Sequence, residues 1–227
     1  MRHWTLIGEA PLPGAAIGRE RSLHLYRGKD DYAIKISGGH ELMNTRMHGS
    51  EDALGRLPCE RIATREGARV LIGGLGMGFT LAAALAVLRQ DGEAVVAELI
   101  PEVVDWNRGE LGDRSGRPLD DPRTTVHIGD VGELIRQSPR GFDAIALDVD
   151  NGPEGLTQDD NDWLYDARGI AAVQAALRPK GVVAWWSAGP DKTFEAQLRR
   201  TGFRVQSHTV RAHGNKGPRH VIWLCST

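Results

Sequence analysis

The chain has 227 residues, of which 41% are hydrophobic and 26% charged, and its formal net charge is -2. This length suits one α/β domain with a small addition, and the near-neutral charge argues against a nucleic-acid partner, which usually requires a basic surface. No stretch approaches the roughly 20 apolar residues of a membrane helix. The first residues do not show the apolar run that is typical of a signal peptide, and Cys59 and Cys225 show no CxxC spacing. We therefore expect a cytoplasmic protein with no membrane partner and no bound metal.

The amino-terminal residues differ in pattern from the rest of the chain. Apolar and polar residues alternate over 22–26 and again over 32–37, with a turn at 28–31 between them. This pattern predicts a β-hairpin. We therefore divide the chain into a small β region, residues 1–45, and a main domain, residues 46–227. The hairpin also offers an open edge through which two copies of the chain could form a homodimer.

A helix is expected to follow the small β region. Ser50 is a suitable N-cap, and Glu51 and Asp52 then supply the acidic first turn that a helix favours. Pro58 is expected to break or kink this helix, because proline lacks the backbone N–H.

From residue 68 onward, short apolar runs alternate with helical patterns. The predicted strands are 69–73, 93–98, 124–128, 142–147, 182–187, 203–210 and 220–224, and the predicted helices are 80–88, 101–111, 131–137, 161–177 and 193–200. The helix at 161–177 is expected to start at Asp160 or Asn161. Such alternation predicts a doubly wound, mostly parallel seven-stranded sheet. Residues 211–219 are too few for a helical crossover, so the last strand should be antiparallel.

Polar residues and glycines stand where successive strands end. Ligands of such sheets bind beyond the carboxyl ends of the strands. Gly73 and Glu98 are the last residues of predicted strands, and Asp130 and Asp148 come just after the next two strands. We therefore expect these four positions to meet at one edge of the sheet and to form a ligand site.

The first of these positions opens a glycine loop at residues 73–78, in which Gly73, Gly74, Gly76 and Gly78 are the glycines. A strand that turns directly into a helix uses glycines so that the backbone can approach a ligand. A dinucleotide-binding loop would need a third glycine at Phe79. The spacing therefore favours a nucleoside with a charged tail over a nicotinamide cofactor, and the alternative is a tight turn without a ligand.

Two carboxylates are candidates for holding that nucleoside. Glu98 stands where a carboxylate can accept both hydrogen bonds from a ribose diol. Asp130 could accept from an adenine amino group, or it could simply cap the helix that follows.

The densest polar cluster is residues 147–153, which contain Asp148, Asp150 and Asn151. Clustered carboxylates beside the glycine loop could bind an amine, remove its proton or balance a sulfonium charge. The alternatives are a divalent-metal loop and an ordinary turn.

Taken together, these segments resemble the spermidine synthase family, a branch of the S-adenosylmethionine-dependent transferase fold, over residues 41 to 224. The similar segments are residues 70–74, 98–104, 129–130 and 148–153, the last with the downstream Leu164 and Tyr165. Residues 45–54, which include Glu51, faintly resemble a further segment of the family, the gate of its active site. The amino-terminal hairpin corresponds to the small β-domain of the family.

The resemblance implies transfer of an alkyl group from a sulfonium to a small amine. It implies that Asp148 helps to deprotonate the attacking amine and that Asp150, the second candidate catalytic residue, shares in holding the charge of the polyamine. Asn151, Glu51 and Tyr165 are the candidate substrate contacts.

One departure from the family pattern concerns the cofactor. Gly76 stands where the family has an Asp that anchors the amino end of decarboxylated S-adenosylmethionine. We therefore predict methyl or related alkyl transfer from intact S-adenosylmethionine. The alternatives are aminopropyl transfer from the decarboxylated cofactor to putrescine or a relative, and a non-catalytic, dimeric nucleoside-binding module.

Overall fold

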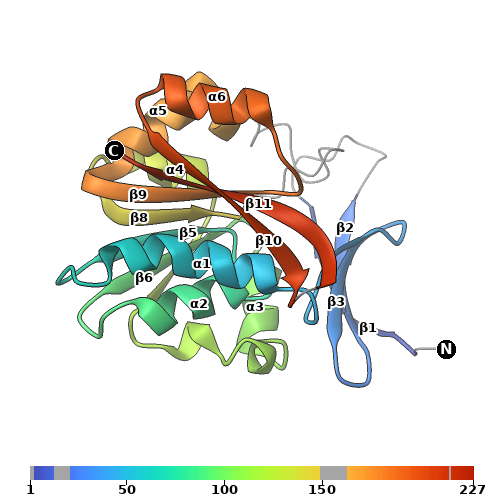
Figure 1. Ribbon diagram of the computed structural model, residues 1–227. Helices are drawn as coiled ribbons and strands as arrows, with labels where there is room; N and C mark the ends of the chain where they lie inside the picture. Colours follow the sequence, from blue (N-terminus) through green and yellow to red (C-terminus); the bar gives the residue numbers. More distant parts are fainter. Residues whose placement is uncertain (1–2, 13–20, 149–162, 215) are drawn as a thin grey trace.

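The computed structural model describes residues 3–12, 21–148, 163–214 and 216–227. Figure 1 shows two sheets, a small one near the amino terminus and a large one flanked by helices. The strands are β1 (Thr5–Pro11), β2 (Ser22–Arg27), β3 (Tyr32–Ile36), β4 (Glu41–Asn44), β5 (Arg69–Gly73), β6 (Glu93–Glu98), β7 (Thr124–Ile128), β8 (Phe142–Leu147), β9 (Leu177–Ser187), β10 (Arg204–His213) and β11 (Lys216–Ser226).

The large sheet has seven strands in the order β10-β11-β9-β8-β5-β6-β7. Strands β5 to β9 pair in parallel, whereas β11 lies between β9 and β10 and is antiparallel to both. The predicted mostly parallel sheet with an antiparallel last strand is therefore confirmed. Both β10 and β11 are longer than expected, and His213 at the end of β10 pairs with Lys216 at the start of β11.

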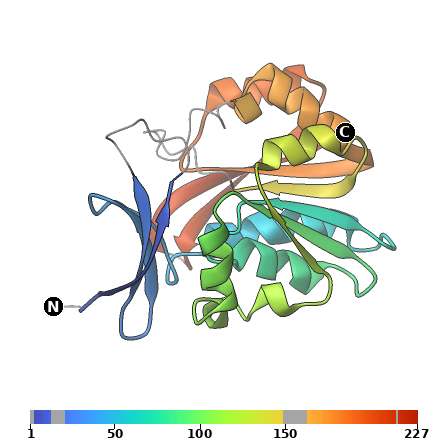
Figure 2. The same ribbon diagram turned by 180° about the vertical axis from the view of Figure 1, so that it is seen from behind.

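Helices lie on both sides of this sheet, with α1, α2 and α3 on one side and α4, α5 and α6 on the other (Figures 1 and 2). They are α1 (Gly49–Ile62), α2 (Phe79–Val87), α3 (Pro101–Arg108), α4 (Val131–Gln137), α5 (Ala167–Ala176) and α6 (Lys192–Arg200). Val70 and Ile72 of β5 belong to one hydrophobic core and Leu71 to the other. This alternation follows from the period-two geometry of a strand. No helix in the described ranges is long and apolar enough to span a bilayer.

The expected break at Pro58 was wrong, because α1 continues through Pro58 to Ile62. Pro58, Cys59 and Ile62 are all buried in the core, so packing outweighs the one backbone hydrogen bond that proline cannot make. The helix also begins earlier than expected, with His48 rather than Ser50 at the N-cap.

The start of α5 is also corrected. The helix begins at Ala167, and the Asp166 side chain caps it by accepting from the backbone amides of Arg168 and Gly169. Asp160 and Asn161, the expected N-caps, lie outside the described residues.

The small sheet is antiparallel, in the order β1-β2-β3-β4. The hairpin of β2 and β3 was expected, but β1 and β4 were not. Its last strand ends at Asn44, next to the proposed boundary at residue 45. This sheet stands across the carboxyl ends of the parallel strands (Figure 2).

Candidate functional site

A cavity of about 360 Å³ lies between the small sheet and the carboxyl ends of the parallel strands. This volume falls in the range of about 300–1,000 Å³ that ligand sites usually have. Gly74, Glu98, Asp130 and Asp148 all line it, each from the end of a different parallel strand. Three of the four strand-end positions singled out in the sequence, Glu98, Asp130 and Asp148, therefore meet at one cavity. The glycine loop borders it at Gly74 and Gly76 rather than at Gly73 or Gly78.

The glycine loop uses backbone conformations that residues with a side chain rarely adopt. Gly74, Gly76 and Gly78 have φ angles of 90°, 52° and 82°. A Cβ on Gly74 would lie 2.6 Å from the carbonyl oxygen of Asp148, so the loop backbone lies directly against the end of β8. Gly73 ends β5, and a Cβ there would lie 2.9 Å from the side chain of Leu147.

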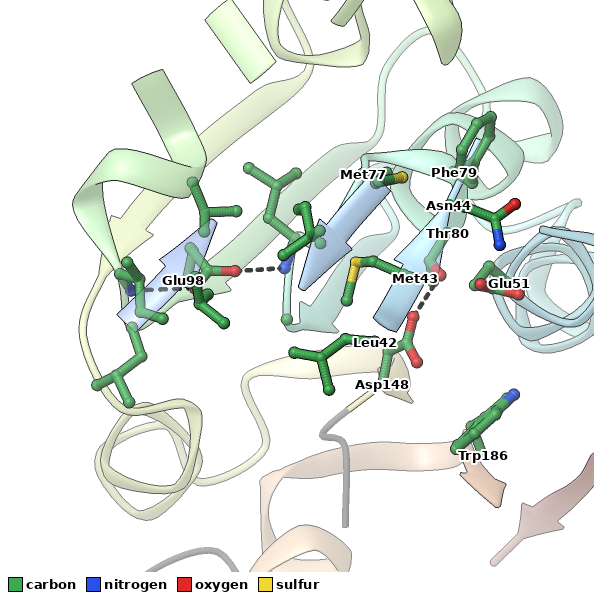
Figure 3. A pocket seen from close by; sticks show the side chains of 18 of the residues that line it. Leu42, Met43, Asn44, Glu51, Met77, Phe79, Thr80, Glu98, Asp148 and Trp186 are labelled. Atoms are coloured by element: carbon green, nitrogen blue, oxygen red, sulfur yellow. Dashed lines mark hydrogen bonds between the residues drawn. The ribbon is translucent and has the colours of Figure 1, made fainter. Parts of the chain in front are cut away.

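Glu98 lies at the end of β6 and is buried, with only 8% of the residue exposed. Its Oε2 accepts from the backbone amide of Leu75 over 2.9 Å, and its Oε1 accepts from that of Ile100 over 3.0 Å (Figure 3). Burial raises the pKa of this carboxyl, and the backbone hydrogen bonds oppose that rise. The carboxylate thus fastens the glycine loop to β6.

Asp130 is the N-cap of α4 and also lines the cavity. Its carboxylate accepts from the backbone amides of Gly132 and Glu133 over 2.9 and 3.0 Å. The capping role that the sequence left open is therefore present, and contact with a nucleoside remains a prediction for Asp130.

Asp148 follows β8 directly and is connected to both neighbouring elements. Its backbone amide donates to the carbonyl of Gly73, and its Oδ2 accepts from the hydroxyl of Thr80 over 2.9 Å. Thr80 lies in the first turn of α2, so the helix that follows the glycine loop also orients Asp148. Asp150 and Asn151 lie outside the described residues.

Of the two other expected substrate contacts, only one lies in the cavity lining. Glu51 projects into it from the start of α1, facing the same space as Asp148 (Figure 3). Tyr165 instead packs against Phe194 in the core beneath α5 and α6, with ring centroids 5.2 Å apart.

Three lining residues were not anticipated from the sequence: Leu42, Met43 and Asn44 reach the cavity from β4 (Figure 3). Trp186 also lines the cavity, from the end of β9, and its position follows the same strand-end rule as that of Asp148. The contribution of β4 depends on how the small sheet meets the large one, which no local pattern reveals.

The cavity wall is acidic. Among its described residues it has five carboxylates and one histidine, His220, but no lysine or arginine; the carboxylates are Glu41, Glu51, Glu98, Asp130 and Asp148. Such a wall suits a cationic ligand. Within the described ranges, no three His, Cys, Asp or Glu side chains are arranged to hold a metal ion.

Residues 48–196 match the spermine/spermidine synthase domain family. Among solved structures, a spermidine synthase in complex with the transition-state analogue AdoDATO has a TM-score of 0.72 at 18% identity, covering 97% of this chain and 72% of that one. Spermidine synthase from Thermotoga maritima has a TM-score of 0.69 at 19% identity, covering 91% and 69% of the two chains. No curated protein sequence matches the chain.

Because the family match spans most of its length, the chain belongs to the spermine/spermidine synthase family. The resemblance seen in the sequence and the assignment as a transferase related to S-adenosylmethionine are thereby confirmed. The structural likeness independently supports the fold.

Proposed function

We propose that this member of the spermine/spermidine synthase family transfers an aminopropyl group from decarboxylated S-adenosylmethionine to a small cationic amine. The observation that carries the proposal is the acidic wall, which presents five carboxylates and, among its described residues, no lysine or arginine. A donor that bears a carboxylate would meet like charge there without a cationic side chain to pair with. A donor and an acceptor that are both cationic suit this wall.

The described residues fit such a donor. The glycine loop brings backbone close to the cavity at Gly74 and Gly76, which leaves room for a nucleoside. Asp130 borders the cavity at the start of α4 and is the candidate contact for the adenine amino group. Glu98, which supports the loop from beneath, is the candidate partner of the ribose hydroxyls.

When bound, the donor would supply an electrophilic carbon beside its sulfonium. The chain's own contribution is to align an amine with that carbon and to take up the proton that the amine loses. Asp148, held by Thr80, is the candidate proton acceptor. The surrounding apolar side chains of Leu42 and Met43 restrict water from the same space.

A second candidate, methyl transfer from intact S-adenosylmethionine, is favoured by one observation. Gly76 has no side chain, and the position of its missing Cβ lies 3.2 Å from the Sδ of Met43. The tail of the donor would thus meet a thioether at this point of the loop, where the family has a carboxylate. This was our preferred reaction from the sequence, and the acidic wall now favours the aminopropyl alternative.

Calorimetric titration with S-adenosylmethionine, its decarboxylated form and methylthioadenosine tests these alternatives, together with product analysis on a panel of diamines. We expect the decarboxylated form to bind at least about tenfold tighter than the intact one, equivalent to about 1.4 kcal/mol, and to yield an aminopropylated amine. Preferred binding of the intact form, with a methylated product, would establish the second candidate. Binding of a nucleoside ligand without formation of any product, with an affinity that Asp148→Asn does not change, would favour a non-catalytic binding module.

A further inference from the structure

A chain of three polar side chains runs along the cavity wall between α1 and β11. The hydroxyl of Ser50 lies 2.6 Å from the Oε2 of Glu51 and 2.8 Å from the Nδ1 of His220. Ser50 is fully buried, and Glu51 and His220 both line the cavity. The edge of the Trp186 ring meets the His220 ring with centroids 4.8 Å apart. The wall thus places a carboxylate and an imidazole at the two ends of one hydroxyl.

Ser50 has a single hydroxyl hydrogen, so it can donate to only one of its two neighbours at a time. In one arrangement the His220 Nδ1 donates to Ser50 and Ser50 donates to the Glu51 carboxylate. In the other, a protonated Glu51 donates to Ser50 and Ser50 donates to the unprotonated Nδ1 of His220. Both arrangements satisfy every group, and they differ only in which end holds the proton.

We propose that Glu51, Ser50 and His220 form a proton relay that removes the proton lost by the acceptor amine. This inference rests on the proposed function, since it needs an amine in the cavity. It assigns Glu51 a role in proton transfer, in addition to the substrate contact expected from the sequence.

The step balances in protons. The N–H bond of the ammonium breaks and an O–H bond forms on Asp148, which leaves the amine with the lone pair that it needs for attack. The proton then passes to Glu51, which faces the same space, as the O–H bond on Asp148 breaks and one forms on Glu51. Glu51 then passes a proton to the Ser50 oxygen while the Ser50 hydrogen moves to the Nδ1 of His220. The products are a Glu51 carboxylate, an unchanged serine and a His220 imidazolium.

The electrostatic environment supports this path. Burial raises the pKa of Glu51, and it lowers the pKa of His220. The Glu51 carboxylate therefore accepts a proton more readily, and the resting His220 is neutral. The two shifts also bring the proton affinities of Glu51 and His220 closer together, so that a proton can be exchanged between them.

Other charged groups also face this chain. His48 and Asp52 face Glu51 from the start of α1, with opposite effects on its charge, and Asp148 lines the same cavity from β8. His48 and Asp52 are paired with each other over 2.8 Å, which limits the net effect of the two.

The pH dependence of kcat/KM tests the relay. We expect Ser50→Ala and His220→Gln to lower kcat/KM at pH 7 by about 10²-fold, in the range of general base catalysis. Near pH 10, where about 30% of an alkyl amine with a pKa near 10.4 is already unprotonated, the deficit should shrink to within about threefold. A purely structural role would lower the rate by a similar factor at every pH, and that result would overturn the proposal. His208→Gln, on β10 outside the cavity lining, is the matched control and should leave the profile unchanged.

A second measurement needs no turnover. The His220 ring is titrated by NMR in the free wild-type protein, in Glu51→Gln and in Ser50→Ala. Loss of the Glu51 charge should lower the titration midpoint, and loss of Ser50 should change the protonation of Nδ1. An identical His220 titration in all three proteins would overturn the relay even if the enzyme transfers an aminopropyl group. A coupled titration without transfer to any amine would instead contradict the proposed function.

Discussion

The hydroxyl of Thr80 donates a hydrogen bond of 2.9 Å to the Oδ2 of Asp148. This contact joins the first turn of α2, which follows the glycine loop, to the residue proposed to take a proton from the amine. Nearby, a Cβ on Gly55 of α1 would overlap the carbonyl oxygen of Thr80, so α1 crosses α2 closely at this point. The position of Thr80, and through it the orientation of Asp148, therefore depends on helix packing.

We predict that Thr80→Val lowers kcat about fivefold to tenfold, because the loss of one charge-assisted hydrogen bond of about 1–1.4 kcal/mol lets Asp148 leave its orientation. The variant keeps the side-chain shape, so binding of methylthioadenosine should change less than about twofold. Thr80→Ser retains the hydroxyl and is the control. An equal loss of kcat in the serine and valine variants would show that packing of the Thr80 side chain, rather than its hydrogen bond, maintains the rate.

A second prediction concerns Glu98 and pH. Because burial raises its pKa above the ordinary value of 4.5, the folded protein holds this proton more tightly than the unfolded chain does. Stability from this group is thus fully present below pH 4.5 and is lost as the pH rises through the folded pKa. Glu98→Gln has no such titration.

Urea unfolding of wild type and Glu98→Gln between pH 4 and 7 measures this effect. The free energy of unfolding of the wild type, relative to the variant, should fall as the pH rises. A relative stability that instead increases with pH would mean that the backbone amides outweigh burial.

A third prediction addresses the choice of cofactor. Gly76→Asp would place a carboxylate on the loop, and only the flexible end of Met43 stands in the way of its Cβ. We expect the affinity ratio of decarboxylated to intact S-adenosylmethionine to rise about tenfold, equivalent to about 1.4 kcal/mol. Gly76→Asn has the same shape without the charge and also tolerates a positive φ, so it should leave the ratio nearly unchanged. Calorimetry on all three proteins distinguishes charge from shape.

The two roles of Asp130 can be separated by substitution. Asp130→Ala should lower stability by about 1 kcal/mol through loss of the helix cap, or about 2–4 °C in Tm for a chain of this size. Asp130→Ser keeps a capping oxygen and should retain most of that stability, yet it lacks the carboxylate proposed to meet adenine. Affinity for methylthioadenosine should therefore fall in both variants. Unchanged affinity in the serine variant would leave Asp130 with the capping role alone.

The strand-end rule explains how much of the site could be predicted. Gly73 and Glu98 are the last residues of buried parallel strands, and Asp148 comes directly after one. The carboxyl ends of neighbouring parallel strands lie at the same edge of the sheet, however the helices pack. The rule did not extend to the partners of these residues. The hydrogen bonds of Glu98 depend on how the glycine loop folds back over β6, which sequence spacing does not specify.

Residues that reach the site by other routes were harder to predict. Met43 comes from a separate sheet, and His220 comes from an antiparallel strand whose length was underestimated. The prediction at Pro58 was wrong for a related reason. The hydrogen bond that proline cannot make costs stability locally, but burial of the surrounding helix outweighs that loss. In each case the position depends on packing between segments that are far apart in the chain.

The small sheet affects how strongly the carboxylates of the cavity interact with a charged ligand. Leu42 and Met43 of β4 place apolar side chains opposite the glycine loop, beside Glu51 and Asp148. Coulombic interactions strengthen as the local dielectric constant falls, by several-fold between water and a partly buried site. Removing the small sheet would remove Glu41 and leave the carboxylates of the main domain in place, but it would let water screen them. The amino-terminal strands therefore set the dielectric environment in which the carboxylates of the main domain act.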